Sequence, residues 1–247
     1  MVGAIHALQC VWCNTEERNA IYNCSMKPTA NVENGAAPSF VKSDPAQPAF
    51  WNDRFAAEFT PWDQGGVPEC LQQNINHIGA AATFAQPPRV LIPGCGSGYE
   101  VKCFADLGWD VLAIDFSPAA VAQAKNKLSL MNNGSALAAS VHEVDFFGDA
   151  LANKRFDIVY ERAFLCALPR RMWLQWSQRI AALIPSGGRL MGFFFADKID
   201  KGPPFGLADG ELEALLTPNF SRLQLAIPGD SIAVFAGKET WQVWLRN

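Results

Sequence analysis

Three glycines within five residues mark the part of the chain best suited to bind a ligand. The segment Pro93–Gly98 reads Pro-Gly-Cys-Gly-Ser-Gly and includes the end of Arg89–Pro93, a short apolar run typical of a buried strand. Glycines let the backbone turn tightly and approach a ligand closely, and an open α/β sheet binds ligands at this edge. A dinucleotide site favours a glycine where Tyr99 stands, because the next helix receives a pyrophosphate. S-adenosyl-L-methionine has no phosphate, so the spacing favours this cofactor over NAD.

Two acidic residues follow the next two strands and could hold other parts of such a cofactor. Asp115 ends the expected strand 110–115, where a carboxylate can accept hydrogen bonds from both ribose hydroxyls. It could instead cap the next helix, but Ser117 is better placed for that. We therefore expect Asp115 at a solvated strand end. Asp145 follows the third strand and could accept from the adenine amino group while one of the next two phenylalanines stacks on the ring, or it could be an ordinary loop residue.

One arginine is expected where it could contact a bound ligand. Arg162 lies just beyond the expected strand 156–160 and should emerge at the same edge of the sheet as the glycines. A guanidinium keeps its charge at any working pH and can stabilise an anionic acceptor such as a thiolate. The alternative is a salt bridge to Glu161 or Asp157.

The other reactive side chains do not suggest a second site. Cys166 has no histidine nearby, and the chain has three histidines in all, so we interpret it as a packed thiol and not as a nucleophile. The pair Cys10 and Cys13 has no second CxxC and no histidine partner, so we expect no metal site. Methyl transfer from a sulfonium requires neither a Ser-His-Asp triad nor paired carboxylates, because the cofactor supplies the leaving group.

Strands and helices alternate along the chain, which predicts an α/β fold with a mostly parallel, doubly wound sheet and helices on both faces. The expected strands span 89–93, 110–115, 140–144, 156–160, 188–195, 221–226 and 240–245. The expected helices span 50–59, 67–78, 99–107, 118–128, 169–183 and 209–216. Of the three phenylalanines at 193–195, not all can face one side of a strand, so we expect them to be buried core residues.

Composition places the chain among globular proteins and narrows its partners. Of its 247 residues, 49% are hydrophobic and 18% charged, and the net charge is −4, so neither nucleic acid nor an anionic membrane is an expected partner. No apolar stretch reaches the roughly 20 residues that a membrane span needs, and seven scattered cysteines suggest reduced thiols in the cytoplasm. We expect residues 1–45 to be a flexible extension that is dispensable for activity, followed by one monomeric domain over 46–247.

Four segments taken together resemble the thiopurine S-methyltransferase family, including its thiol and halide branch. They are Trp51–Phe55 with Thr60–Gln64, Pro93–Gly96, Tyr160–Leu168 and Gly202–Phe205. They occur in the order typical of the family, between about residue 49 and the end of the chain. The resemblance implies an S-adenosyl-L-methionine-dependent methyltransferase with the Rossmann-like class I fold and seven strands.

The resemblance also implies roles for matching residues. Trp51, Phe55 and Trp62 would lie across the cofactor as a lid, which suits a sulfonium because cations favour aromatic faces. These aromatics could alternatively form a core stripe, although Trp62 stands in a polar, glycine-containing loop. The remaining cofactor contacts would come from Gly94 and Gly96 at the methionine part, Asp115 at the ribose, and Asp145 and Phe146 at the adenine. Arg162 would stand near the acceptor.

Different parts of the sequence resemble branches of the family with different methyl acceptors. Members that act on thiopurines are similar to this chain in carrying arginine at position 162, whereas the halide branch tends to carry tyrosine. The segment Thr60–Asp63 looks more like the halide branch. We therefore expect a small-molecule soft nucleophile, which could be a thiol, a thiopurine or a halide. The alternatives are an N- or O-methyltransferase of a small heterocyclic metabolite and, from a different class, an NAD-binding oxidoreductase or a non-catalytic cofactor-binding module.

Overall fold

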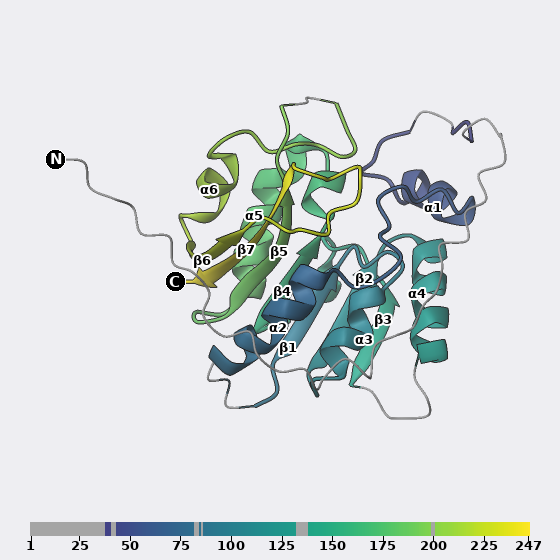
Figure 1. Cartoon of the computed structure of the whole chain (residues 1–247). Coiled ribbons are helices and arrows are strands. Elements are labelled where there is room, and N and C mark those ends of the chain that lie inside the picture. Colours follow the sequence, from purple (N-terminus) through teal and green to yellow (C-terminus); the bar gives the residue numbers. More distant parts are fainter. Residues whose placement is uncertain (1–37, 41–42, 82–83, 85, 132–137, 199–200) are drawn as a thin grey trace. The chain divides into compact units, whose positions relative to one another are not determined.

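The computed structural model describes residues 38–40, 43–81, 84, 86–131, 138–198 and 201–247, which form a seven-stranded sheet with helices on both faces (Figure 1). The Cys10 and Cys13 pair and most of the expected extension over 1–45 lie outside the described residues. The mostly parallel, doubly wound fold expected from the sequence is confirmed.

The strand order is β3-β2-β1-β4-β5-β7-β6, with β1 to β5 parallel and β7 antiparallel to both of its neighbours. The strands are β1 Arg89–Pro93, β2 Asp110–Asp115, β3 Ala139–Glu143, β4 Ile158–Arg162, β5 Arg189–Phe195, β6 Phe220–Ala226 and β7 Glu239–Arg246. The fourth strand begins two residues later than expected because Phe156 donates its N–H to Leu183 at the end of a helix and not to a neighbouring strand. Arg162 is therefore the last residue of β4.

The helices fall close to their expected positions. They are α1 Pro48–Ala56, α2 Glu69–Ala81, α3 Tyr99–Ala105, α4 Pro118–Met131, α5 Trp173–Leu183 and α6 Glu211–Leu216, with short 3₁₀ turns at Asp149–Leu151, Leu165–Ala167 and Arg170–Met172. Helix α1 ends three residues before the expected 59. Glu58 has a φ of 54°, a left-handed conformation that cannot continue a right-handed helix.

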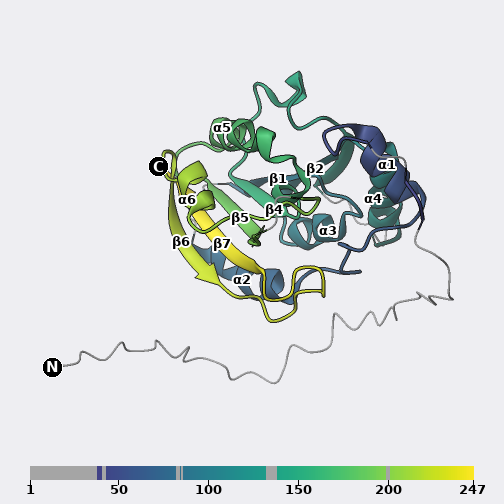
Figure 2. The same ribbon diagram turned by 90° about the horizontal axis from the view of Figure 1, so that it is seen from above.

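The core consists of two layers, one on each face of the sheet. Val90 and Ile92 of β1 pack in a cluster with α2 and α3, whereas Leu91 between them packs in a cluster with α5 and α6. This alternation is the period of two that a strand imposes on its side chains. Helix α5 accordingly lies across the sheet from α2 and α3 (Figure 2). Each face is thus covered by helices and the sheet is buried between them.

The phenylalanines of β5 follow the same rule. Phe193 joins the cluster of α2 and α3, Phe194 joins the cluster of α5 and α6, and Phe195 packs against Phe235. All three are buried, as expected. Because β1 to β5 are parallel, their carboxyl ends meet at one edge of the sheet, where the glycine segment, Asp115 and Arg162 are brought together.

Candidate active site

A cavity of about 540 Å³ lies at the carboxyl edge of the sheet. All nine residues expected to form the site line it: Trp51, Phe55, Trp62, Gly94, Gly96, Asp115, Asp145, Phe146 and Arg162. They come from α1, the loop after it, and the ends of β1, β2, β3 and β4. The fold therefore gathers into one cavity residues that are spread over more than a hundred positions of the chain.

The glycine segment forms a close-fitting wall of this cavity. Gly94 and Gly96 have φ values of 58° and 51°, which favour glycine. A Cβ atom at Gly94 would lie 2.4 Å from the ring of Phe164, and one at Gly96 would lie 3.3 Å from the ring of Phe55. The backbone of the segment is held by a hydrogen bond of 2.9 Å from the Cys95 N–H to the Ile114 carbonyl. The missing side chains leave a groove along which a ligand can contact backbone.

Asp115 is buried, and the expectation of a solvated strand end was wrong. Its side chain belongs to a residue that is 7% exposed, and its two oxygens accept N–H bonds from Gly96 at 3.0 Å and Ser117 at 2.9 Å. Burial raises the pKa of this carboxyl, opposed by hydrogen bonds from Ser117 and Gly96. Ser117 is the cap of α4, as expected, since its Oγ accepts from the Ala120 N–H at 3.2 Å. Each Asp115 oxygen keeps a second lone pair, so the carboxylate fits a pair of ribose hydroxyls.

Asp145 and Phe146 follow β3 with different exposures. Asp145 is exposed, and its Oδ1 accepts from the Phe147 N–H at 2.9 Å, so it stabilises its own loop. Phe146 is 4% exposed, and its ring centroid lies 5.2 Å from that of Phe164, edge to face. The pair presents an aromatic wall beside a free carboxylate oxygen, which suits a flat ring with an amino group.

The aromatic residues of α1 and the following loop cover one side of the cavity. The ring of Trp62 lies edge to face against Trp51 at 5.4 Å and against Phe55 at 5.8 Å. Phe55 is a core residue, but Trp51 and Trp62 are only half-buried, so the alternative of a purely core-facing stripe holds for one of the three. Asp63 connects the loop to the glycine segment by accepting from the Ser97 Oγ at 2.5 Å. The loop is therefore held against the glycine segment on one side of the cavity.

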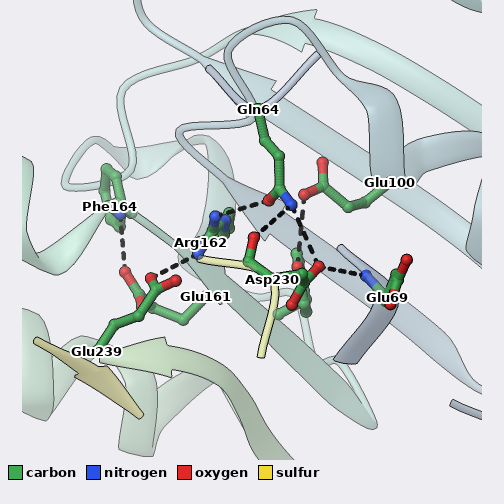
Figure 3. Close-up of polar contacts among 9 residues, drawn as sticks. Gln64, Glu69, Glu100, Glu161, Arg162, Phe164, Asp230 and Glu239 are labelled. Carbon is green, nitrogen blue, oxygen red and sulfur yellow. Dashed lines mark hydrogen bonds and ion pairs between the residues drawn. The ribbon is translucent and has the colours of Figure 1, made fainter. Parts of the chain in front are cut away.

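Arg162 is paired with a carboxylate, but not with either residue expected as an alternative partner. Its Nη1 donates to Glu239 Oε2 at 2.7 Å and its Nη2 donates to Gln64 Oε1 at 3.0 Å (Figure 3). The arginine and glutamate side chains are 12% and 3% exposed. Glu161 instead accepts the N–H groups of Phe164 and Leu165, both at 2.7 Å, through one oxygen. The charge of Arg162 is therefore balanced from β7, on the far side of β5.

Two further buried acids, Glu161 and Glu100, stand close to Arg162, and the sequence interpretation considered only Glu161, as a salt-bridge partner. Burial raises the pKa of the Glu161 carboxyl to about 7. Burial also raises the pKa of Glu100, which lines the cavity and receives a 3.4 Å hydrogen bond from the Tyr160 hydroxyl. Glu100 could have been noticed because it follows the glycine segment by two residues. Glu239 carries no such signal, since it is only the first residue of a C-terminal strand.

The cysteines of the cavity are neutral thiols. Burial raises the pKa of Cys95 and of Cys166 well above the ordinary value, which confirms the interpretation of Cys166 as a packed thiol. No histidine of the described chain lines the cavity. In the same residues, no group of three or more His, Cys, Asp or Glu is arranged to hold a metal ion, and no helix is long and apolar enough to cross a membrane.

Comparison with known proteins identifies the family of the chain. The family model described as thiopurine S-methyltransferase matches residues 46–246. The chain is 32% identical to probable thiol methyltransferase 2 of Arabidopsis thaliana over 169 residues, 68% of this chain and 71% of the relative. It is 28% identical to the thiopurine S-methyltransferase of Shewanella piezotolerans, over 73% and 86% of the two chains.

A solved structure supports the fold independently. The magnesium protoporphyrin IX methyltransferase of Synechocystis, solved with bound S-adenosylmethionine, superposes with a TM-score of 0.63 at 18% identity and covers 85% of this chain and all of its own. At that identity the likeness establishes the fold. Together with the family match over 46–246, it identifies the chain as an S-adenosylmethionine-dependent methyltransferase that belongs to the thiopurine S-methyltransferase family.

Proposed function

We propose that this enzyme methylates a small-molecule soft nucleophile, a thiol, a thiopurine or a halide. The observation that carries the proposal is the division of one cavity into two kinds of wall. One wall is the glycine segment with Asp115, and the other is built of apolar residues around Arg162. The relatives named as thiol and thiopurine methyltransferases favour the same acceptor class.

The first wall fits the cofactor. When bound, S-adenosylmethionine would supply a methyl carbon for in-line attack by the acceptor, with the thioether of S-adenosylhomocysteine as the leaving group. In our proposal Gly94 and Gly96 admit the methionine part, Asp115 accepts from the ribose hydroxyls, and Asp145 and Phe146 hold the adenine. The rings of Trp51, Phe55 and Trp62 then cover the sulfonium, because a cation is stabilised by aromatic faces. These residues bind, orient and exclude water; none of them exchanges a proton.

The second wall fits an apolar acceptor. Its lining includes Phe164, Met172, Pro203, Pro204, Val234 and Phe235. Phe205, the last residue of the Gly202–Phe205 segment, is only half-buried and does not line it. Contacts with Glu239 and Gln64 engage two of the five N–H donors of Arg162. We propose that Arg162 orients the acceptor with its remaining donors. Because Glu239 balances its charge, it contributes hydrogen bonds more than a net positive field.

The acceptor supplies its own nucleophilic electron pair in this proposal. The thiols of Cys95 and Cys166 stay protonated at working pH, because burial raises their pKa values. A sulfur acceptor of low pKa loses its proton to water before it binds and needs no general base. A halide has no proton to lose. Both kinds of acceptor are therefore compatible with a wall that holds no histidine among the described residues.

A panel assay tests the proposal. Purified enzyme is incubated with S-adenosylmethionine and, separately, with thiols, thiopurines, iodide and catechols, and methyl transfer is measured. We expect turnover with at least one sulfur or halide acceptor. Strong activity on an oxygen or nitrogen acceptor, with none on any thiol or halide, would refute this acceptor class. In parallel, calorimetric titration should give a dissociation constant of about micromolar size for S-adenosylhomocysteine, near 8 kcal/mol of binding free energy, and no comparable binding of NAD.

We also propose that the enzyme is a cytoplasmic monomer that does not act on nucleic acid. The net charge of −4 supports this, as do the free thiols of Cys70, Cys95, Cys103 and Cys166, which suit a reducing compartment. Sedimentation equilibrium tests the oligomeric part. A mass near 27 kDa is expected, and a stable species of twice that mass would contradict it.

A further inference from the structure

The side chain of Gln64 connects two loops and a strand on the acceptor side of the cavity. Its Oε1 accepts from Arg162 Nη2 at 3.0 Å, at the end of β4. Its Nε2 donates to the backbone carbonyl of Asp230 at 3.0 Å and to Asp230 Oδ2 at 3.1 Å, in the segment between β6 and β7 (Figure 3). The amide thus uses its acceptor end and its donor end on partners from different parts of the chain.

Both partners are fixed by other contacts. Arg162 is held by the 2.7 Å ion pair with the buried Glu239. Asp230 Oδ2 accepts from the Glu69 N–H at 2.6 Å, which ties it to the first turn of α2. Gln64 therefore spans two anchored points. A carboxylate at position 64 could not donate to Asp230. A hydrocarbon side chain there could neither donate to Asp230 nor accept from Arg162.

The segments that Gln64 joins carry parts of both walls, Trp62 on the cofactor side and Val234 and Phe235 on the acceptor side. Trp62 and Asp63 precede it, and Val234 and Phe235 follow Asp230; all four line the cavity. The cofactor side of the same loop is held separately, by the Asp63 contact with Ser97 and by the edge-to-face packing of Trp62. Loss of the Gln64 contacts should thus loosen the acceptor side and leave the cofactor side in place.

We propose that Gln64 is a positioning residue for methyl transfer, which sets the orientation of Arg162 and the distance between the loops of Trp62 and Phe235. This inference rests on the proposed function, in that the wall concerned is the one assigned to the acceptor. A wall that is displaced by about an ångström costs catalysis through misalignment even when the cofactor still binds. The expected signature is a change in acceptor kinetics without a change in cofactor affinity.

The first experiment compares Gln64→Leu with Gln72→Leu in the full chain. Gln72 is an exposed glutamine of α2 whose Nε2 bonds only locally, to the Val67 carbonyl, so it is a matched control. We expect Gln64→Leu to lower kcat/KM for the acceptor by about tenfold to a hundredfold, the range for hydrogen bonds to charged groups. The affinity for S-adenosylhomocysteine should change less than about twofold, and Gln72→Leu should resemble the parent. Parent-like kinetics in Gln64→Leu, or an equal loss of cofactor affinity, would overturn the inference.

Exchanging the amide and the carboxylate between positions 64 and 230 tests the direction of the hydrogen bonds. In Gln64→Glu the carboxylate still accepts from Arg162 but faces Asp230 without a donor, so kcat/KM should fall. In the double variant Gln64→Glu/Asp230→Asn the amide at position 230 donates to the carboxylate at position 64, and net charge is restored. We expect the double variant to recover at least about half of the lost free energy. A double variant no better than Gln64→Glu would overturn the inference.

Hydrogen exchange gives a readout that does not depend on activity. Backbone amides of 60–66 and 228–236 should exchange faster in Gln64→Leu, whereas those of β1 and α3 should be unchanged. Uniform protection, or faster exchange throughout the chain, would overturn the inference. The proposed function is judged on the parent enzyme alone: if the parent methylates only another acceptor class, the same kinetic comparison is made with that acceptor.

Discussion

The two charged residues at the centre of the site, Asp115 and Arg162, are held in opposite ways. Asp115 is satisfied by backbone N–H groups of Gly96 and Ser117, which belong to the adjoining strand-loop-helix connections. Arg162 is satisfied by side chains, Glu239 on β7 and Gln64 after α1, that lie 77 and 98 positions away in the sequence. The side that we assign to the cofactor is therefore built by neighbouring βα units, whereas the side that we assign to the acceptor depends on the strand order across the whole sheet.

This difference has energetic consequences. Removal of a carboxylate that backbone N–H groups hold breaks their hydrogen bonds. The N–H donors left behind lie near a cavity that water can enter. An arginine paired with a glutamate that is 3% exposed leaves a buried charge when it is removed. Substitutions on the acceptor side should thus affect folding strongly, and substitutions on the cofactor side should affect ligand binding more than folding.

The largest expected effect is that of Arg162→Met on stability. Glu239 would remain buried without its cation, and its Oε1 has no hydrogen-bond partner among the residues that the structure describes. We expect a loss of about 3–5 kcal/mol in the free energy of unfolding, measured by urea denaturation. This variant therefore cannot isolate the role of Arg162 in turnover. Arg162→Lys, which keeps the charge, is the better kinetic variant.

The matched control for this prediction is the double variant Arg162→Met/Glu239→Gln, which removes both charges. It should regain a large part of the lost stability, because a neutral amide is less costly to bury than a lone carboxylate. If Arg162→Met alone is as stable as the parent, the ion pair does not hold the acceptor side together and the comparison drawn above is wrong.

The next effect concerns pH and Glu161, on the same side of the site. Its folded pKa of about 7 exceeds the ordinary value of 4.5, so the folded state holds a proton that the unfolded state releases between these pH values. Stability from this group is full below pH 4.5 and is lost as pH rises through about 7. The expected loss is on the order of 3 kcal/mol. Glu161→Gln keeps an oxygen to accept from Phe164 and Leu165 and should remove that loss.

The measurement compares unfolding free energies at pH 5 and pH 7.5. From pH 5 to pH 7.5 the free energy of unfolding should fall less in Glu161→Gln than in the parent, by an amount on the order of 3 kcal/mol. Glu143→Gln is the control, since Glu143 is exposed on β3. Other groups contribute equally to the parent and the variant, so they cancel. Parallel pH dependence in the two proteins would show that Glu161 is ionised alike in the folded and unfolded states.

On the cofactor side, Asp115→Ala should weaken binding of S-adenosylhomocysteine by about 1.5–3 kcal/mol, measured by calorimetry. Because the residue is buried and bonds Gly96 and Ser117, we now also expect a loss of about 1–2 kcal/mol in stability, where a solvated residue would have cost almost nothing. Asp110→Ala is the control, because its ion pair with Arg89 is exposed and worth little. Unaltered cofactor affinity in Asp115→Ala would show that the ribose assignment is wrong.

The same distinction, between contacts of residues close in sequence and contacts of distant residues, decided what could be predicted from the sequence. The boundaries of β1 and β2, the glycine segment and the cap at Ser117 were predicted correctly, because each depends on neighbouring residues. The burial of Asp115 was not, because it follows from how the loop folds back over the strand end.

The partner of Arg162 could not be predicted for a different reason. Glu161 and Asp157 were considered because they are close in sequence, but successive residues of a strand point to opposite faces of the sheet, and Asp157 precedes β4. Glu239 comes near Arg162 only because β7 pairs with β5 so that Glu239 lies opposite Phe195. Gln64 stands in a segment that was noticed for its tryptophan, yet its partner Asp230 is 166 positions away. Such contacts are fixed by sheet order, which the alternation of strands and helices does not specify.

The smallest expected effect concerns the residue at which the folded domain begins, on the side of the site that neighbouring residues build. The segment before α1 touches it: the ring of Phe40 lies 5.6 Å from that of Phe59 and 4.5 Å from the Arg54 guanidinium, and Pro45 accepts from Trp51 Nε1 at 2.8 Å. A chain that begins at Ala37 keeps these contacts, and we expect its turnover and its unfolding free energy to match those of the full chain. A chain that begins at Gln47 loses them, so we now place the start of the domain nearer residue 37 than the expected 46. That chain should be less stable by about 1 kcal/mol and bind the cofactor more weakly, because the Trp51 ring loses the hydrogen bond that orients it. Thermal unfolding and calorimetry on the two truncations provide the test. If both behave as the full chain, the aromatic cover is fixed by α1 and Trp62 alone; if the longer one already fails to fold, residues 1–36 belong to the domain and the expected boundary is wrong.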